Sequence, residues 1–315
     1  MPQITPMHRH LLTRTPAALS YLEWGSGESV LMLHGLADHG LVWQSLAERL
    51  APTYRCLAPD LRGHGDSGKP NDPAAYDALE FVRDLEAFAD ALLTEPVTVI
   101  AHSWAAKLAL LWAKQSPHRV KQLILVDPFF VNTLPKLFRP TLPIFYRTLP
   151  FLKVMGPFPN RASAAALAQT LKQYRGWSPL QQAVFDAAME EKPDGTWGSK
   201  FALAARNGVF EDILNRAGLT ESLAVPTHLL LPQGGLNRMA WQTRPYYRYL
   251  TNLQTQTLPG NHWPHLVEPE AFNGEIAAIL GHPSQELPQE KNQQTKIVSR
   301  NHSTDYFRFD DYPIR

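Results

Sequence analysis

The fold is decided by the stretch PVTVIAHSWAAKLALL, which spans residues 96–111. Its first part, residues 97–100, is an apolar and largely β-branched run that predicts a short buried strand. Helical spacing follows over residues 105–113, so the strand is expected to turn into a helix within a few residues. Ser103 stands at this break between His102 and Trp104, with Ala101 and Ala105 two positions to either side. A turn of this kind would expose the serine hydroxyl beyond the end of the strand.

Strand and helix patterns alternate on both sides of this stretch. The alternation, with largely continuous apolar strands, predicts an α/β fold with a mostly parallel sheet of roughly eight strands and helices on both faces. The strands are expected at 10–15, 17–24, 30–33, 54–58, 97–100, 123–126, 227–231 and 253–258, and the helices at 41–50, 76–93, 105–113, 239–250 (with an interruption at Pro245) and 268–280.

The alternation is lost between residues 129 and 224, after the sixth expected strand. This segment predicts a helical cap, with helices at 162–174, 179–190, 200–207 and 211–217, inserted into a core formed by residues 1–128 and 225–282. Residues 283–315 are expected to form a polar C-terminal tail. The first part of the insertion, between Phe129 and Phe185, contains no Asp or Glu but seven basic residues: Lys136, Arg139, Arg147, Lys153, Arg161, Lys172 and Arg175.

The bulk composition excludes several classes of protein. The 30 Lys and Arg residues nearly balance the 29 Asp and Glu residues, which argues against a nucleic-acid-binding protein. The single cysteine, Cys56, excludes an intrachain disulfide. We find neither a secretory signal nor an apolar run long enough to span a bilayer, and we therefore expect a cytoplasmic protein.

Polar residues stand at the carboxyl ends of the expected parallel strands, where α/β sheets bind their ligands. They are the His34-Gly35 pair, Asp60, Ser103 and Asp127. Chemistry should therefore converge at this edge of the sheet.

Four motifs in order resemble those of the α/β-hydrolase superfamily, in particular the capped branch of esterases, lipases, carbon–carbon bond hydrolases, haloperoxidases, epoxide hydrolases and dehalogenases. The resemblance covers about residues 17–280 apart from the insertion. The motifs are LMLHGLADHGLVW at 31–43, APDLRGHGDSGKP at 58–70, VIAHSWAAKLAL at 99–110 and GNHWPHLVEPEAF at 260–272.

The resemblance implies that Ser103 is a nucleophile and His262 its general base. The family pattern around the nucleophile is G-x-S-x-G, whereas this chain has alanine at both glycine positions. His265, three residues after His262, fits the family less well. By resemblance, the backbone amides of Leu36 and Trp104 would form the oxyanion hole.

Two positions are candidates for the acid that would orient His262. The family's usual position follows the strand at 227–231, where this chain carries Asn237. Some members place the acid one strand earlier, which here is Asp127. We expect Asp127 to be this acid, with Asn237 in its place, or neither residue, as the alternatives. Asparagine can orient an imidazole but cannot balance its positive charge.

The sequence thus predicts a serine hydrolase that cleaves an apolar carboxylic ester or thioester, without cofactor or metal. The histidines lack a HExxH-like spacing, and the glycines lack the motifs of nucleotide-binding loops. The basic run of the insertion could face an anionic substrate, a membrane surface or only solvent. The alternative is a ligand-binding protein with weakened catalysis, and the oligomeric state is left open.

Overall fold

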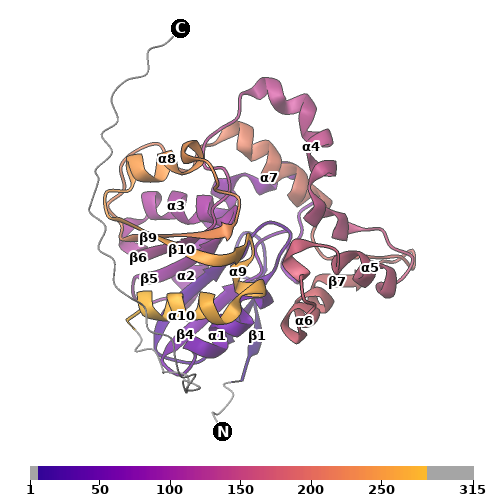
Figure 1. Ribbon diagram of the computed structural model, residues 1–315, viewed down its shortest axis with the longest axis horizontal. Coiled ribbons are helices and arrows are strands. Elements are labelled where there is room, and N and C mark those ends of the chain that lie inside the picture. The colour runs from indigo at the N-terminus through magenta and orange to yellow at the C-terminus, as the bar shows by residue number, and fades with distance from the viewer. Residues whose placement is uncertain (1–5, 282–315) are drawn as a thin grey trace, which may run out of the picture.

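A single eight-stranded sheet forms the centre of the computed structural model, which describes residues 6–281 (Figure 1). The two pairings of β2, with β1 and with β4, are antiparallel, and all others are parallel. The prediction of a mostly parallel sheet is thereby confirmed. The spatial order is β1 (His8–Leu12), β2 (Leu19–Trp24), β4 (Tyr54–Pro59), β3 (Glu28–Leu33), β5 (Val97–His102), β6 (Val120–Val126), β9 (Thr227–Gly234) and β10 (Leu253–Asn261).

Helices cover both faces of the sheet because its central strands are apolar on both sides. In β6, Leu123 and Leu125 belong to one buried cluster, whereas Ile124 and Val126 belong to the other. Such alternation follows from the two-residue period of a strand. The first cluster lies under α2 (Ala78–Leu92), α3 (Ala105–Gln115) and α8 (Ala240–Tyr249), and the second lies under α1 (Gln44–Leu50) and α10 (Pro269–Ile279).

Between β6 and β9 the chain leaves the sheet and forms the insertion, residues 129–224, which lies beside the sheet in Figure 1. Whether it is a separate domain stays a prediction. Its helices are η4 (Lys136–Thr141), α4 (Leu142–Thr148), η5 (Pro150–Met155), α5 (Arg161–Ala168), η6 (Lys172–Tyr174), α6 (Pro179–Ala188) and α7 (Leu203–Asn215).

Three local expectations about the insertion and the helix after β9 were wrong. The two helices expected at 200–207 and 211–217 are the single helix α7. The insertion also contains a small antiparallel sheet of β7 (Met189–Glu191) and β8 (Trp197–Ser199), which are too short to show a sequence period. Helix α8 runs uninterrupted through Pro245.

The predicted polar tail at 283–315 lies outside the described residues. None of the helices within residues 6–281 combines the length and the apolar character needed to cross a bilayer.

Candidate active site

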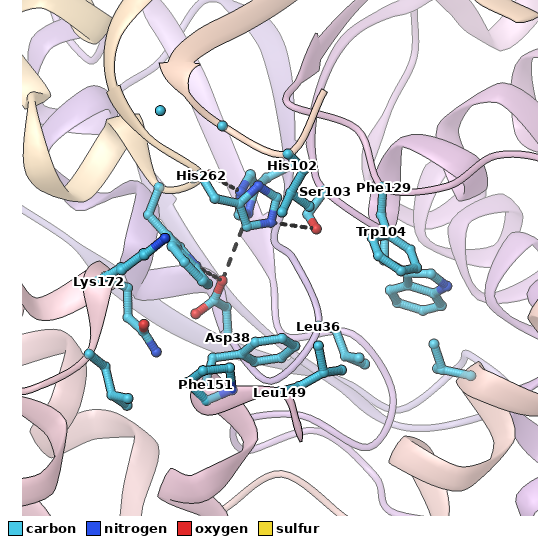
Figure 2. Close-up of a pocket in the computed structure, with 18 of the residues that line it drawn as sticks. Leu36, Asp38, His102, Ser103, Trp104, Phe129, Leu149, Phe151, Lys172 and His262 are labelled. Carbon is cyan, nitrogen blue, oxygen red and sulfur yellow. Dashed lines mark hydrogen bonds and ion pairs between the residues drawn. The ribbon is translucent and has the colours of Figure 1, made fainter. Parts of the chain in front are cut away.

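Three strand ends bring the predicted nucleophile, base and acid into one hydrogen-bonded chain. Ser103 follows β5, Asp127 follows β6 and His262 follows β10. The Nδ1 atom of His262 lies 2.6 Å from Oδ2 of Asp127. The Nε2 atom of the same ring lies 2.9 Å from Oγ of Ser103 (Figure 2). One imidazole therefore links a buried carboxyl to a hydroxyl, which is the geometry required to move a proton from the hydroxyl to the ring.

Ser103 occupies a strained backbone position at the turn between β5 and α3. Its φ of 56° lies in the left-handed region, which non-glycine residues adopt only when surrounding structure enforces it. The Ser103 amide donates to the carbonyl of Val126 at 2.9 Å, so it is tied to the neighbouring strand. Ala101 and Ala105 are both fully buried where strand and helix pass closely. Small side chains thus occupy the positions at which the family pattern has glycine.

Asp127 is fully buried, and its carboxylate is held by three donors. The Leu236 amide donates to Oδ2 at 2.8 Å and the side-chain amide of Asn237 donates to Oδ1 at 2.8 Å, in addition to the His262 contact. Hydrogen bonds of this kind offset the cost of burying a charged carboxylate. A Cβ on Gly235 would lie 2.5 Å from Oδ2, so the loop after β9 approaches this closely only because residue 235 is glycine.

Asn237, the alternative to Asp127, binds Asp127 rather than His262. Its Nδ2 atom donates to the Asp127 carboxylate and to the carbonyl of Pro128 at 2.9 Å. The residue at the family's usual acid position therefore orients the carboxylate that contacts the imidazole.

His265, the other histidine near the end of β10, lies in the core. Its ring stacks on Trp43 with centroids 4.7 Å apart, and burial lowers its pKa to about 3. Neither ring nitrogen has a hydrogen-bond partner within residues 6–281. His265 is therefore a neutral packing residue. In the same part of the chain, no group of three or more His, Cys, Asp or Glu residues is arranged to hold a metal ion.

The two residues expected to form an oxyanion hole border the same cavity as Ser103. Leu36 follows β3, and Trp104 directly follows Ser103. Within residues 6–281 neither backbone amide donates to a backbone carbonyl. Both amides are thus available to a ligand, as an oxyanion hole requires.

The cavity has a volume of about 540 Å³ and a mostly apolar lining (Figure 2). Its floor is the strand edge with Ser103 and His262, and the insertion supplies most of the remaining wall. This size and lining suit a small organic ligand. The apolar wall includes Leu36, Phe129, Leu149, Phe151, Val209, Phe210, Ile213 and Leu236.

Asp38 is a site residue that the sequence analysis missed. It lines the cavity and accepts a hydrogen bond from Nε1 of Trp263 at 3.3 Å. Burial raises the pKa of its carboxyl to about 7, and the indole hydrogen bond only partly opposes this shift. Its position four residues after His34, at the end of a predicted strand, was the only signal available in the sequence.

The chain belongs to the α/β-hydrolase fold family, whose profile matches residues 28–269. Curated relatives include a cis-3-alkyl-4-alkyloxetan-2-one decarboxylase of Shewanella oneidensis, 33% identical over 39% of this chain and 40% of that protein. A haloalkane dehalogenase of Mesorhizobium japonicum is 38% identical over 40% of each chain, and epoxide hydrolase 3 of Siraitia grosvenorii is 36% identical over 36% of each. The chain thus matches only about two fifths of the length of these relatives.

Two solved structures superpose on most of this chain. The thioesterase domain from the curacin biosynthetic pathway superposes with a TM-score of 0.72 at 23% identity, covering 87% of this chain and 99% of that one. E-2-(acetamidomethylene)succinate hydrolase gives a TM-score of 0.73 at 19% identity, covering 88% and 100%. At these identities the likeness concerns the fold alone.

Proposed function

We propose that the chain is a serine hydrolase that cleaves a carboxylic ester or thioester through an acyl-enzyme. The observation that carries the proposal is the continuous chain from Asp127 through His262 to Ser103, with its 2.6 Å and 2.9 Å contacts. This series of hydrogen bonds ends at Ser103, which lies in a strained turn at the floor of an apolar cavity.

The mechanism follows from the roles that this geometry permits. The Ser103 hydroxyl attacks the carbonyl carbon while its proton passes to Nε2 of His262, and Asp127 stabilises the imidazolium. The amides of Leu36 and Trp104 bind the oxyanion. His262 then protonates the leaving alcohol or thiol. Water, deprotonated by His262, cleaves the acyl-enzyme and restores Ser103.

The identity of the nucleophile favours acyl transfer over the alkyl chemistry that the names of some relatives imply. A serine that displaced a halide or opened an epoxide would form an ether, which water activated by His262 does not cleave. An acyl–serine ester, in contrast, is readily hydrolysed. We therefore infer a carboxylic acid derivative as the substrate.

The lining of the cavity favours an apolar acyl group. Phe151, Phe210 and Ile213 line the same cavity as Ser103, and the exposed Lys172 is one of the few charged residues at its border. Apolar surface buried against such a wall contributes roughly 25 cal/mol per Å². We expect activity to rise with acyl chain length until the cavity is filled.

Labelling with a fluorophosphonate probe tests the proposal, because the probe phosphorylates activated serines. We expect the wild type to be labelled and Ser103→Ala to remain unlabelled. Equal labelling of both proteins would refute Ser103 as the nucleophile. Hydrolysis of a p-nitrophenyl ester series then measures the chain-length preference.

A ligand-binding protein with weakened catalysis is the second candidate, and the alanines at 101 and 105 are the feature that favours it. The contact between Asp127 and His262 counts against it, since the hydrogen-bonded chain needed for turnover is present. Tight binding of an apolar ester without hydrolysis or probe labelling would support this candidate over the hydrolase.

A further inference from the structure

The carboxyl of Asp38 lies where three loops of the candidate site meet. Asp38 belongs to the loop after β3, which also carries Leu36. Its Oδ2 atom lies 3.3 Å from Nε1 of Trp263. The same atom lies 3.8 Å from Nδ1 of His102, and Asp38 and His102 are both labelled in Figure 2. Trp263 directly follows His262, and His102 directly precedes Ser103. One mostly buried side chain therefore faces the neighbours of both the proposed base and the proposed nucleophile.

The protonation state of His102 follows from its contacts. Its Nε2 atom lies 2.7 Å from the backbone carbonyl of His262, which can only accept, so Nε2 carries a proton. Burial holds the pKa of the ring well below 6.5, and the ring is therefore neutral. Nδ1 is then a bare acceptor, and within residues 6–281 it has no hydrogen-bond partner. Leaving a buried acceptor unpaired is costly.

We propose that Asp38 is a positioning residue, whose protonated carboxyl donates to Nδ1 of His102 and so holds the loop of His262 against the loop of Ser103. The inference rests on the proposed serine hydrolase function. The 3.8 Å separation is too long for a hydrogen bond. A small rotation of Asp38 would shorten it, and the side chain borders the open cavity, which leaves room for that movement.

The resulting chain runs from Asp38 through His102 to the carbonyl of His262. While Asp38 is protonated, each link pairs a donor with an acceptor. When Asp38 ionises, its carboxylate faces the lone pair of Nδ1, and the first link is lost. Since burial raises the pKa of Asp38 to about 7, this change falls within the working range of many enzymes.

Few other groups near this series of hydrogen bonds change their charge close to pH 7. The phenol of Tyr174 on η6 borders Asp38, and burial raises its pKa far above neutrality. Burial lowers the pKa of His265 to about 3 and that of His34 to about 4, so both stay neutral. Lys172 is an exposed cation at the border of the cavity. His262 is the remaining ionisable group that faces His102.

The test compares Asp38→Asn with Asp38→Ala. The asparagine amide keeps the donor at every pH, whereas alanine removes it. The need for a neutral His262 affects both proteins alike, so wild type and Asp38→Asn are compared at each pH on a p-nitrophenyl ester. We expect their kcat values to agree within a few-fold at pH 6, and kcat of the wild type to fall below that of Asp38→Asn as the pH rises through about 7. Asp38→Ala should lose about 10- to 100-fold in kcat at pH 6, since small misplacements of reacting groups have effects of this size.

A spectroscopic readout tests the inference without catalysis. The imidazole ¹⁵N resonances of His102 should identify an Nε2–H tautomer. The Nδ1 resonance should shift as the pH passes about 7 in the wild type and stay constant in Asp38→Asn. A proton on Nδ1, or the same pH profile in wild type and Asp38→Asn, would overturn the inference. If the wild type shows no probe labelling at Ser103, the proposed function fails, and the ¹⁵N titration still decides whether Asp38 donates to His102.

Discussion

We propose that Asp127 acts as the acid that the family usually places one strand later. An amide in its place would keep the size of the side chain but lose the negative charge that stabilises the imidazolium. We expect Asp127→Asn to lower kcat by about 10³- to 10⁴-fold, with a smaller effect on KM. Steady-state hydrolysis of a p-nitrophenyl ester measures both constants.

Asn237→Ala is the matched control for that substitution. It removes one of the donors to Asp127 and leaves the contact between Asp127 and His262 in place. We expect a loss of about tenfold or less, equivalent to one weakened hydrogen bond. A larger loss for Asn237→Ala than for Asp127→Asn would mean that Asn237, not Asp127, supports the base.

Asp38 should also make the stability of the protein depend on pH. Its pKa is raised from 3.8 to about 7 in the folded state, so the unfolded chain ionises first as the pH rises. The contribution of this group to the free energy of unfolding is fully present below pH 3.8 and is lost as the pH rises to about 7. At about 1.4 kcal/mol per pKa unit, this contribution is at most about 4 kcal/mol. Asparagine at this position does not titrate.

Thermal unfolding of wild type and Asp38→Asn at a series of pH values measures this effect. We expect the stability difference in favour of the variant to grow between about pH 4 and pH 7 and then to level off. A difference that stays constant over this range would show that the carboxyl titrates normally in the folded protein.

At the scale of elements, the sheet was predictable because its central strands show continuous apolar runs bounded by turn residues. The insertion was less predictable because close packing, not local pattern, decides its elements. Gly208 lies between the two helices expected at 200–207 and 211–217, yet in the structure it lies inside α7. A Cβ there would lie 2.2 Å from the carbonyl of Pro73 in η2 (Pro73–Tyr76), so this glycine permits contact between elements distant in sequence.

The residues of the candidate site could be predicted as far as the ends of the strands that carry them could be predicted. Ser103, Asp127 and His262 each follow a strand that the pattern locates, and parallel strands bring their carboxyl ends together. The sequence favoured Asp127 but left Asn237 as an alternative, because both lie at the correct edge of the sheet. The proposed role of Asp38 depends on its proximity to His102 and Trp263, which no local pattern records.

The loop after β9 packs closely against the carboxylate of Asp127 at Gly235, and a substitution there tests whether this close contact matters. Gly235→Ala would place a methyl group 2.5 Å from Oδ2 of Asp127 and displace either the loop or the carboxylate. We expect a loss of at least about 100-fold in kcat from the resulting misplacement. Ester hydrolysis measures the loss, and circular dichroism checks that the fold is retained.

Gly274→Ala is the corresponding control within α10. A Cβ at this exposed helix position would meet nothing within 4 Å. Replacing glycine by alanine inside a helix should stabilise the protein by about 1 kcal/mol and leave kcat unchanged. Equal kinetics for Gly235→Ala and Gly274→Ala would show that the loop accommodates a methyl group without moving Asp127.

At the scale of the whole molecule, the basic run of the insertion is only partly neutralised. Arg139 pairs with Glu211 and Arg161 pairs with Asp186, so acidic residues later in the chain compensate two of the seven cations. Lys136 and Arg147 remain exposed on η4 and α4. Leu137 and Ile144 on the same two helices are 74% and 66% exposed. Exposed apolar side chains flanked by cations are typical of segments that bind anionic membrane surfaces.

We therefore expect the protein to bind vesicles that contain phosphatidylserine, through η4 and α4. Each apolar side chain would enter the interface, and each nearby cation would contribute about 1 kcal/mol. The double substitution Leu137→Glu with Ile144→Glu should weaken co-sedimentation at least about tenfold. Leu11→Glu is the control, because Leu11 is 62% exposed but lies on the edge strand β1. Hydrolysis of a water-soluble ester should be the same in all three proteins.

Equal vesicle binding by the double variant and the wild type would show that the basic run faces only solvent. Binding that is lost in the double variant, retained in Leu11→Glu and weakened by salt would place this face on the membrane, next to the cavity wall that Leu149 and Phe151 contribute.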